Sequence, residues 1–384
     1  MNRILIASVL KPVNDPRMYE KFGISISRLE GTEVHICGYR EAGSWKKEEG
    51  RGGKEDTDRK IAFHPIFEFN RLSFDRVFAP FKFLGILLKV KPQVIIVTTF
   101  ELLIVTILYR ILFGGKILYD IQENYYRNIR FNQTYPPVIR TVLALYTRTM
   151  EYLSIPFISH CLLAERNYEQ EFSFSKGKSL VIENKYQKQP GEKDPLPRPK
   201  PLSKGPIRLL YSGTISEEYG IFEAINLAEK LHEIHPGISL TIIGYCANKQ
   251  TLNYIKERIE SKDFIQLTGG EDLVSHELIL EEIRKADFGL LSYRPNKSTE
   301  NCIPTRLFEY QAQLLPMIIA ENKLWEQICA PNTAAIFIHY KSFHPAHLLQ
   351  QLTETTFYPA GLNPDVFWTS EEIKLQDLIK SYLK

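Results

Sequence analysis

Short runs of apolar residues alternate with longer amphipathic segments through the first half of the chain. The runs predict buried strands at residues 3–9, 33–38, 93–98, 116–120, 161–164 and 179–183. The segments between them predict helices at residues 15–28, 73–90 with a break at Pro80, 100–113, 137–153 and 165–172. Continuous apolar strands need cover on both faces, so this order predicts a parallel sheet with crossover helices.

A proline-rich stretch, residues 186–205, separates this half from a second one with the same alternation. Proline removes a backbone donor and fixes φ, so the stretch predicts a linker. Beyond it, strands are expected at 207–212, 239–244, 264–268, 288–292, 317–320 and 334–338. Helices are expected at 221–234, 249–259, 275–285, 305–312, 323–330, 345–353 and from Thr369 onward.

The whole pattern predicts an α/β protein of two doubly wound, Rossmann-like domains that face a cleft. The first domain takes residues 1–187, the linker 188–205 and the second domain 206–365. A C-terminal helix takes residues 366–384, with packing back on the first domain left open. Ligands of such sheets bind beyond the carboxyl ends of the strands, so residues directly after strands are the candidates for function.

Composition narrows the class of protein. The 384 residues include 48 Lys and Arg against 45 Asp and Glu, a net charge of +3 that does not suggest a nucleic-acid binder. The five scattered cysteines form no CxxC pair and are expected to be reduced thiols. The first apolar run is short and is followed directly by Lys11 and Pro12, which favours a strand over a signal peptide.

The mostly apolar residues 94–113 are long enough to require a membrane test. Glu101 and Arg110 lie inside this stretch, and a charge at the centre of a bilayer costs roughly 3 kcal/mol. A buried strand followed by a buried helix explains the run, so no transmembrane span is predicted.

The strongest local signal is the segment from Asn301 to Tyr310, which follows a predicted strand after a polar loop. We expect Thr305 to cap a helix whose first turn carries Arg306, with Glu309 one turn later. A helix N-terminus and an arginine suit a diphosphate, and Glu309 suits ribose hydroxyls. The alternative is a surface pair of Arg306 and Glu309 on an ordinary amphipathic helix.

Gly213 and Thr214 directly follow the first strand of the second domain. A glycine there lets backbone N–H groups approach an anion closely, and a plain tight turn is the equal alternative.

The chain resembles the family 4 glycosyltransferases of the GT-B fold over essentially its whole length. The resemblance rests on residues 12–21, 119–124, 211–214 and 303–309. It implies that the second domain binds a nucleotide sugar through a Glu-x7-Glu motif. Glu309 matches the second glutamate, which holds the ribose, whereas Asn301 stands at the first, with Glu300 one residue earlier. Pro304 and Thr305 complete the donor-binding segment.

The resemblance also implies roles at positions where this chain departs from its relatives. Gln122 replaces a histidine that reaches toward the transferred sugar, so it is able to position but not to relay a proton. Asp120 and Glu123 beside it are candidates near the reacting centre, with a structural role as the alternative. Thr214 stands where relatives carry an arginine, which makes Arg306 the main phosphate cation, with Arg17 reaching across the cleft.

Other candidates follow from position alone. Glu101, after the strand at 93–98, is expected to contact the acceptor or to cap a helix. Gly244 and Tyr245 follow another strand and are expected near the nucleotide base, or to cover the sheet end. Asp56 and Asp58 match a DxD pattern but lie in a charged loop, so no metal site is predicted. Nor is a cofactor, since the nucleotide sugar is a co-substrate.

Residues 71–91 mix cations with bulky apolar side chains. The favoured interpretation is a crossover helix with its cations turned outward, and the alternative is a helix lying on an anionic membrane.

These observations predict a cytoplasmic, metal-independent, retaining hexosyltransferase of polysaccharide biosynthesis. It would move a sugar from a nucleotide-diphosphate donor to a glycan or a lipid-linked acceptor, without nucleic acid as a partner. Peripheral contact with the inner face of the membrane stays open. A sugar-nucleotide epimerase is an enzymatic alternative against which the resemblance argues. A non-catalytic relative that binds sugar nucleotide, or acts as a scaffold in an assembly complex, is the alternative from another class, because Asn301 and Gln122 are neutral.

Overall fold

The computed structural model describes residues 1–39, 61–68, 74–131, 136–189, 191–192, 194–195, 205–295 and 301–383. Asp56, Asp58, Glu300 and most of the proline-rich stretch 188–205 lie outside these residues. The chain forms two compact units. The first unit contains Met1–Gln187 together with Trp368–Lys384, and the second contains Lys188–Phe367.

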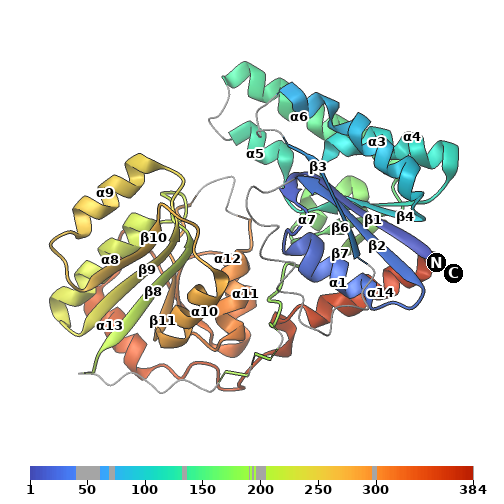
Figure 1. Cartoon of the computed structure of the whole chain (residues 1–384). Helices are drawn as coiled ribbons and strands as arrows, with labels where there is room; N and C mark the ends of the chain where they lie inside the picture. The colour runs from blue at the N-terminus through green and yellow to red at the C-terminus, as the bar shows by residue number, and fades with distance from the viewer. Residues whose placement is uncertain are drawn as a thin grey trace. The chain divides into compact units, whose positions relative to one another are not determined.

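The first unit is built on a parallel sheet of seven strands in the order β3-β2-β1-β4-β5-β6-β7 (Figure 1). The strands are β1 (Asn2–Pro12), β2 (Thr32–Tyr39), β3 (Ile61–Phe67), β4 (Val94–Val97), β5 (Lys116–Ile121), β6 (His160–Leu163) and β7 (Ser179–Val181). The central strands β1 and β4 are apolar and buried, and Ile4 pairs with Val94 across them. Both faces of this sheet therefore need helices.

Helices cover the two faces of this sheet with separate apolar cores. On one face, Phe83 of α3 and Tyr109 of α4 pack with β1, β4 and β5. On the other face, Phe22 and Trp368 pack with the same strands. The helical segments are η1 (a π-helix, Arg17–Gly23), α1 (Ile24–Ser27), η2 (Phe74–Phe78), α3 (Ala79–Val90), η3 (Phe100–Leu102), α4 (Leu103–Phe113), α5 (Tyr125–Phe131), α6 (Pro137–Ser154), η4 (Ile155–Phe157), α7 (Tyr168–Glu171), η5 (Ser173–Ser175) and α14 (Thr369–Leu383).

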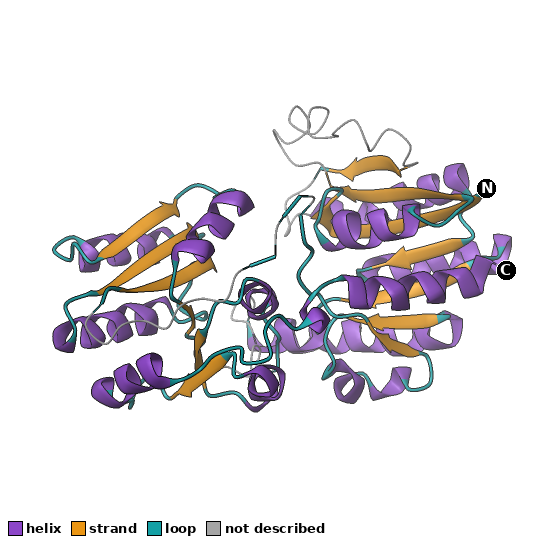
Figure 2. Ribbon diagram, turned by 90° about the horizontal axis from the view of Figure 1, so that it is seen from below, coloured by secondary structure: helices purple, strands orange, loops and turns teal. Residues whose placement is uncertain are grey.

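The second unit contains a six-stranded parallel sheet in the order β10-β9-β8-β11-β12-β13. Its strands are β8 (Ile207–Thr214), β9 (Ile238–Tyr245), β10 (Ile265–Gly270), β11 (Phe288–Leu291), β12 (Met317–Ala320) and β13 (Ala335–Ile338). Its helical segments are α8 (Ile221–Ile234), α9 (Lys249–Ile259), α10 (His276–Lys285), α11 (Thr305–Ala312), α12 (Lys323–Cys329), η6 (Ala330–Asn332), α13 (Pro345–Glu354) and η7 (Pro364–Val366). In both units, helices lie on either side of the strands (Figure 2).

The predicted two-sheet α/β fold is confirmed, and the local differences have physical reasons. Strand β3 was not predicted because it is half-buried and contains Pro65, which an edge strand tolerates. Helix α5 was not predicted because it buries no residue and so has no apolar stripe. The expected helix at 15–28 is a π-helical turn followed by the short α1. The stretch 94–113 is β4, η3 and α4, as predicted.

Candidate functional site

Glycines lie side by side where three strands of the second unit end. Gly213 of β8 pairs with Gly244 of β9, and Gly244 pairs with Gly269 of β10. Their φ angles are +90°, +152° and +84°, which side-chain-bearing residues rarely adopt. A Cβ atom on Gly244 would lie 1.6 Å from the carbonyl oxygen of Gly213. The chain therefore requires glycine at this edge, and the backbone there is not covered by side chains of its own.

The loop after β8 turns back against the end of β11. Gly220, with φ of +76°, closes the loop and immediately precedes α8. The Ser292 hydroxyl donates to the Gly220 carbonyl at 2.7 Å, and a Cβ on Gly220 would collide with the Ser292 backbone. The ends of β8 and β11 are thereby joined beside the start of α8.

Helix α11 begins at Thr305, as predicted, but Thr305 is not its cap. The N-cap residue is Pro304, which makes no side-chain capping hydrogen bond, and the Thr305 side chain is exposed. Proline has no polar side chain, so it cannot cap the amide groups of the first turn. Within the described residues, no group accepts a hydrogen bond from the N–H of Thr305 or Arg306. This helix start thus keeps two donors for a ligand.

Arg306 extends from α11 to the end of β8. Its guanidinium donates to the Ser212 carbonyl and, at 3.0 Å, to the Tyr293 hydroxyl. The rings of Tyr211, Tyr219 and Tyr293 surround it at 5.4, 5.8 and 5.5 Å from its central carbon. A Cβ on Gly213 would lie 3.4 Å from the side chain of Arg306. The predicted Gly213 and Arg306 therefore meet at one place.

The charge of Arg306 is buried and, among the described residues, no carboxylate forms an ion pair with it. Burial lowers the pKa of this guanidinium, but Tyr293, Tyr211 and Tyr310 offset that effect, and the pKa lies above its ordinary value. The surface pair of Arg306 and Glu309 considered from the sequence is not formed. Arg306 is a permanent buried cation placed among neutral oxygens.

A second arginine near these loops has a different environment. Arg294 donates to Glu223 at 2.7 Å and forms an ion pair with Glu217 at 3.3 Å, and its N–H donates to the Glu218 carbonyl. Two carboxylates thus balance the charge of Arg294, and its contacts with Glu217 and Glu218 hold the β8–α8 loop in place. Arg294 stabilises the loop, and Arg306 is the cation that remains for an anion.

Glu309 lies one turn into α11 and interacts with a residue that the sequence did not single out. Its Oε1 atom is 2.5 Å from Nε2 of His276, the first residue of α10. No described residue donates to its other oxygen, Oε2. Glu309 is thus oriented by His276 and retains an acceptor for ligand hydroxyls.

Asn301 lies in the half-buried turn that leads into α11. The next carbonyl, that of Cys302, accepts a hydrogen bond from the Trp325 indole at 2.7 Å. The Trp325 ring also packs edge-on against Tyr293 at 5.3 Å. The turn before α11 and the tyrosine that contacts Arg306 are therefore supported by the same tryptophan.

Thr214 and Tyr245 are also neighbours, because they pair at the ends of β8 and β9. Both side chains are exposed.

The sequence did not predict three residues of this region, Tyr293, His276 and Gly269. Gly269 has a signal like that of Gly213, a glycine at a strand end, and Tyr293 directly follows the strand predicted at 288–292. Nothing in the pattern around His276 indicates its partner.

In the first unit, Asp120 is fully buried at the end of β5 and binds Arg17. The Arg17 guanidinium donates to its two carboxylate oxygens at 2.7 and 3.0 Å, and to the Ile182 carbonyl at 2.9 Å. Gln122 donates to the same carboxylate at 2.8 Å. Arg17 therefore binds Asp120 and the Ile182 carbonyl of its own unit, contacts that the sequence did not predict.

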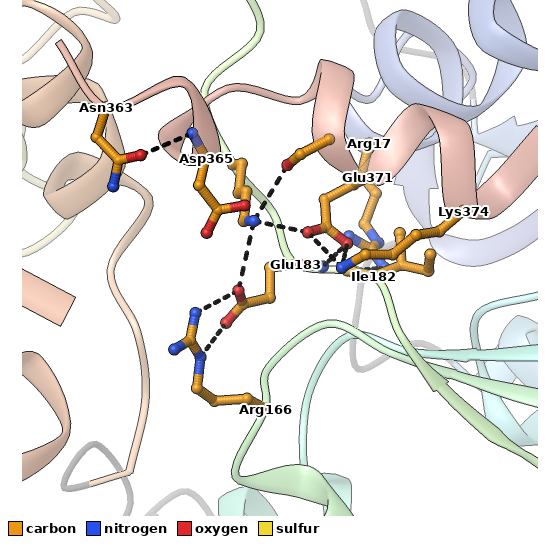
Figure 3. Close-up of polar contacts among 10 residues, drawn as sticks. Arg17, Arg166, Ile182, Glu183, Asn363, Asp365, Glu371 and Lys374 are labelled. Carbon is orange, nitrogen blue, oxygen red and sulfur yellow. Dashed lines mark hydrogen bonds and ion pairs between the residues drawn. The ribbon is translucent and has the colours of Figure 1, made fainter. Parts of the chain in front are cut away.

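A buried charge network lies at the end of β7, next to this pair. Lys185 is only 2% exposed, and its ammonium lies 2.7 Å from Glu371 of α14 and 3.1 Å from the Ser370 hydroxyl. Glu183 accepts two hydrogen bonds from Arg166, at 2.7 and 2.8 Å (Figure 3). Glu371 also binds Lys374 of α14, and the contacts of Lys185 with Glu371 and Ser370 attach α14 to the end of β7.

Glu101 and Glu123 differ in how well their oxygens are satisfied. Glu123 accepts from Asn128 at 3.0 Å. Glu101 follows β4 and pairs with Arg76 through Oε1, whereas its Oε2 is buried and accepts no hydrogen bond from any described residue. Among the described candidates for contact with the acceptor, only Glu101 has a buried carboxylate oxygen without a hydrogen-bond partner.

The described residues contain no cluster of three or more His, Cys, Asp or Glu side chains arranged to hold a metal ion. They also contain no helix with the length and apolar character needed to cross a bilayer.

The chain matches no protein-family model and no curated sequence. Solved structures match it from end to end. Sucrose-phosphate synthase from Thermosynechococcus elongatus is 13% identical with a TM-score of 0.66, and the match covers 100% of this chain and 99% of that one. HepE from Anabaena, in complex with UDP and glucose, is 12% identical with a TM-score of 0.63 and the same coverage. The catalytic domain of starch synthase IV from Arabidopsis thaliana, bound to ADP and acarbose, is 12% identical with a TM-score of 0.61, again with 100% and 99% covered. The chain has the GT-B fold of these glycosyltransferases.

Proposed function

We propose that this chain is a retaining glycosyltransferase that uses a nucleotide-diphosphate sugar. The observation that carries the proposal is Arg306, a buried cation without a carboxylate partner among the described residues. It lies beside the glycine edge at Gly213 and on the uncapped first turn of α11. Fixed donors and one permanent charge at a helix start are suited to a diphosphate.

The same groups suit the chemistry of transfer. As the bond between the sugar and the diphosphate breaks, its electron pair goes to the departing phosphate oxygen. Arg306 and the N–H groups of Thr305 and Arg306 would stabilise the charge that develops there. The acceptor oxygen forms the new bond to the sugar, and its proton passes to the departing diphosphate. Gln122 cannot carry that proton, and Asp120 is engaged with Arg17.

The remaining donor contacts are assigned by position. Oε2 of Glu309 would accept hydrogen bonds from ribose hydroxyls while His276 holds Oε1. Asn301 would bind the sugar with a neutral side chain, and Tyr245 would lie near the base. Structures of HepE with UDP-glucose and of starch synthase IV with ADP support a nucleoside diphosphate as the class of ligand.

The first unit is proposed to contribute the acceptor side. Glu101, which follows β4, would contact an acceptor hydroxyl, with Gln122 and Glu123 after the neighbouring strand β5. The acceptor is a glycan or a lipid-linked sugar, and the transferred group a hexose. Because protein donors serve the diphosphate, the proposal includes no metal ion and no cofactor. The proposed location is the cytoplasm.

A non-catalytic sugar-nucleotide binder is the second candidate, and one observation favours it. Asp120, the carboxylate expected near the reacting centre, is fully buried and held by Arg17 and Gln122, so it cannot act as a base without breaking this pair. Incubation with a panel of nucleotide sugars separates the candidates. If a donor binds but is neither transferred nor hydrolysed, the enzyme is excluded.

The test of the diphosphate site compares Arg306→Gln with Arg208→Gln. Both arginines contact β8, but Arg208 is at the opposite end of the strand, in a surface pair with Asp287. The ligand is UDP, ADP or GDP, whichever the native protein binds. We expect Arg306→Gln to weaken its binding by roughly ten- to hundredfold, because the substitution removes a charge-assisted hydrogen bond. Arg208→Gln should leave the affinity unchanged.

Calorimetric titration measures the affinities, and unfolding curves without ligand show whether each variant is folded. Arg306→Lys, which keeps the charge but not the fork of donors, should bind with intermediate affinity. A folded Arg306→Gln protein that binds the nucleotide as tightly as the native one would show that the diphosphate lies elsewhere.

A further inference from the structure

Large apolar side chains are exposed unevenly along the chain. Most of those exposed in the described residues lie between Val77 and Phe157, in one part of the first unit. Most of these come from α3, α4 and α6, and α4 contacts both of the other helices. Figure 1 shows these three helices together along the same side of the sheet. We name the exposed apolar side chains of α3, α4 and α6 the outer face.

Helix α4 supplies the centre of the outer face. It buries Val105 and Tyr109 against the sheet and exposes Ile104, Leu108 and Leu112 on its other side. Leu112 is 72% exposed. The exposed residues recur at a spacing of four, so they form a second apolar stripe along the helix. A helix that needs only one apolar face to pack on its sheet therefore has two.

Helices α3 and α6 extend this stripe on both sides. In α3, Phe81 is 70% exposed and Leu88 lies two turns further on, whereas Phe83 and Leu87 are buried. In α6, exposed apolar side chains recur at helical spacing over its whole length. They include Val138, Val142, Leu145 and Tyr152. The outer face thus spans three adjacent helices, more than scattered exposed residues on a monomer's surface require.

The charges on these helices have one sign at the surface. Helices α3 and α4 contain no acidic residue, and the one acidic residue of α6, Glu151, is fully buried. The cations Lys82 and Lys89 are exposed in α3 and Arg140 of α6 is partly exposed, whereas Arg148 of α6 forms an ion pair with Glu151 and is not part of this surface. Apolar side chains interspersed with long cationic ones match the surface of an anionic bilayer, where lysine and arginine reach the headgroups.

We propose that the outer face binds the chain to an anionic lipid bilayer as a peripheral protein. Lysine is depleted in the centres of protein–protein interfaces, which argues against a second protein as the occupant. None of these helices is able to span a bilayer, so they lie in the surface of the membrane. If the chain is also the glycosyltransferase proposed above, the membrane-bound unit would meet a lipid-linked acceptor there; the membrane proposal itself does not depend on that activity.

The experiment is flotation of the whole chain with lipid vesicles. Vesicles of phosphatidylcholine and phosphatidylglycerol in equal amounts are compared with vesicles of phosphatidylcholine alone. We expect the chain to float with the anionic vesicles, and high salt to reduce this binding because part of the attraction is electrostatic. Binding to phosphatidylcholine alone should be weaker.

Matched double variants test the position of the face. Phe81→Ser with Leu112→Ser removes two of its most exposed apolar groups and should weaken vesicle binding on the order of tenfold or more. The control, Tyr254→Ser with Leu273→Ser, alters exposed apolar residues of the second unit, where Leu273 is 77% exposed. It should bind vesicles as the native chain does.

Two outcomes would overturn the proposal. In one, the native chain does not float with either vesicle, or Phe81→Ser with Leu112→Ser floats as well as the control. In the other, the native chain is a dimer that this double variant dissociates, which would assign the face to a second copy. Nucleotide binding is measured on the same variants and should not change, so failure here is distinct from failure of the glycosyltransferase proposal.

Discussion

The two buried arginines at strand ends, Arg17 and Arg306, differ in what surrounds their charge. Arg17 forms an ion pair with the carboxylate of Asp120, and its guanidinium also donates to the Ile182 carbonyl. Arg306 faces a carbonyl and tyrosine hydroxyls, without a carboxylate in the described residues. Removing one partner of a compensated buried pair destabilises a fold, whereas a buried cation without a carboxylate partner marks a candidate anion site.

Asp120→Asn is expected to destabilise the first unit. The substitution keeps the shape of the side chain but removes the charge that compensates Arg17, and breaking a buried pair in this way costs about 3–5 kcal/mol. Urea unfolding measures the loss. Adding Arg17→Met to Asp120→Asn should restore part of it, because no buried charge then remains. A protein that keeps its full stability with Asp120→Asn but loses transfer activity would instead make Asp120 a catalytic residue.

At the scale of the elements, helix α6 carries a buried carboxyl group that bonds to the sheet. Glu151 accepts a hydrogen bond from the Tyr119 hydroxyl of β5 at 3.0 Å. Burial raises its pKa from 4.5 to about 7, despite the opposing effects of Arg148 and the bond from Tyr119. The native chain therefore keeps this group protonated at a pH where an unfolded chain has released the proton.

This difference in pKa gives a stability that falls as the pH rises from about 5 to 7. Over that range the native state binds more protons than the unfolded state. Glu151→Gln, which still accepts from Tyr119, should remove this slope and raise the stability at pH 8 by on the order of 1–3 kcal/mol. Thermal unfolding at several pH values measures the effect, with Glu169→Gln, an exposed position of α7, as the control. An unchanged slope in Glu151→Gln would assign the pH dependence to other groups.

At the scale of the whole molecule, the first unit contains two separate parts of the sequence. After the second unit, the chain returns at Trp368, which packs against Phe22 at 5.8 Å and donates to the Ser25 hydroxyl at 2.9 Å. Its backbone N–H donates to the Tyr186 carbonyl, and Glu371 binds Lys185. Residues 368–383 therefore complete the core of the first unit.

Trp368→Ala should lower the stability of the first unit by about 3–5 kcal/mol, the cost of removing a buried aromatic side chain. The unfolding of the second unit should not shift. Calorimetry with proteolysis of partly unfolded protein distinguishes the two transitions. Trp325→Ala, which removes an equally buried tryptophan from the second unit, should show the reverse pattern. Equal shifts in both units would contradict this assignment of Trp368.

The sequence predicted those parts of the molecule that depend on local pattern. In the second unit, helices α8, α9 and α11 have the expected bounds because their apolar stripes begin and end sharply. Gly213 and Arg306 were singled out from their positions in the sequence, and the structure places them side by side. The contacts of Arg306 with Tyr293 and of Glu309 with His276 were not predictable, because they join elements through the fold. For the same reason the pairing of Arg17 with Asp120 was missed.

The return of residues 368–383 to the first unit also fixes an order for the folding of the chain during synthesis. Lys185 is made long before Glu371, and all of Lys188–Phe367 must leave the ribosome in between. At about 5–20 residues per second, that delay lasts on the order of ten to forty seconds. During this time the sheet of the first unit lacks Trp368 and one partner of Lys185, so apolar surface that chaperones recognise stays uncovered. The second unit, whose residues are contiguous, is the part that is able to finish folding first.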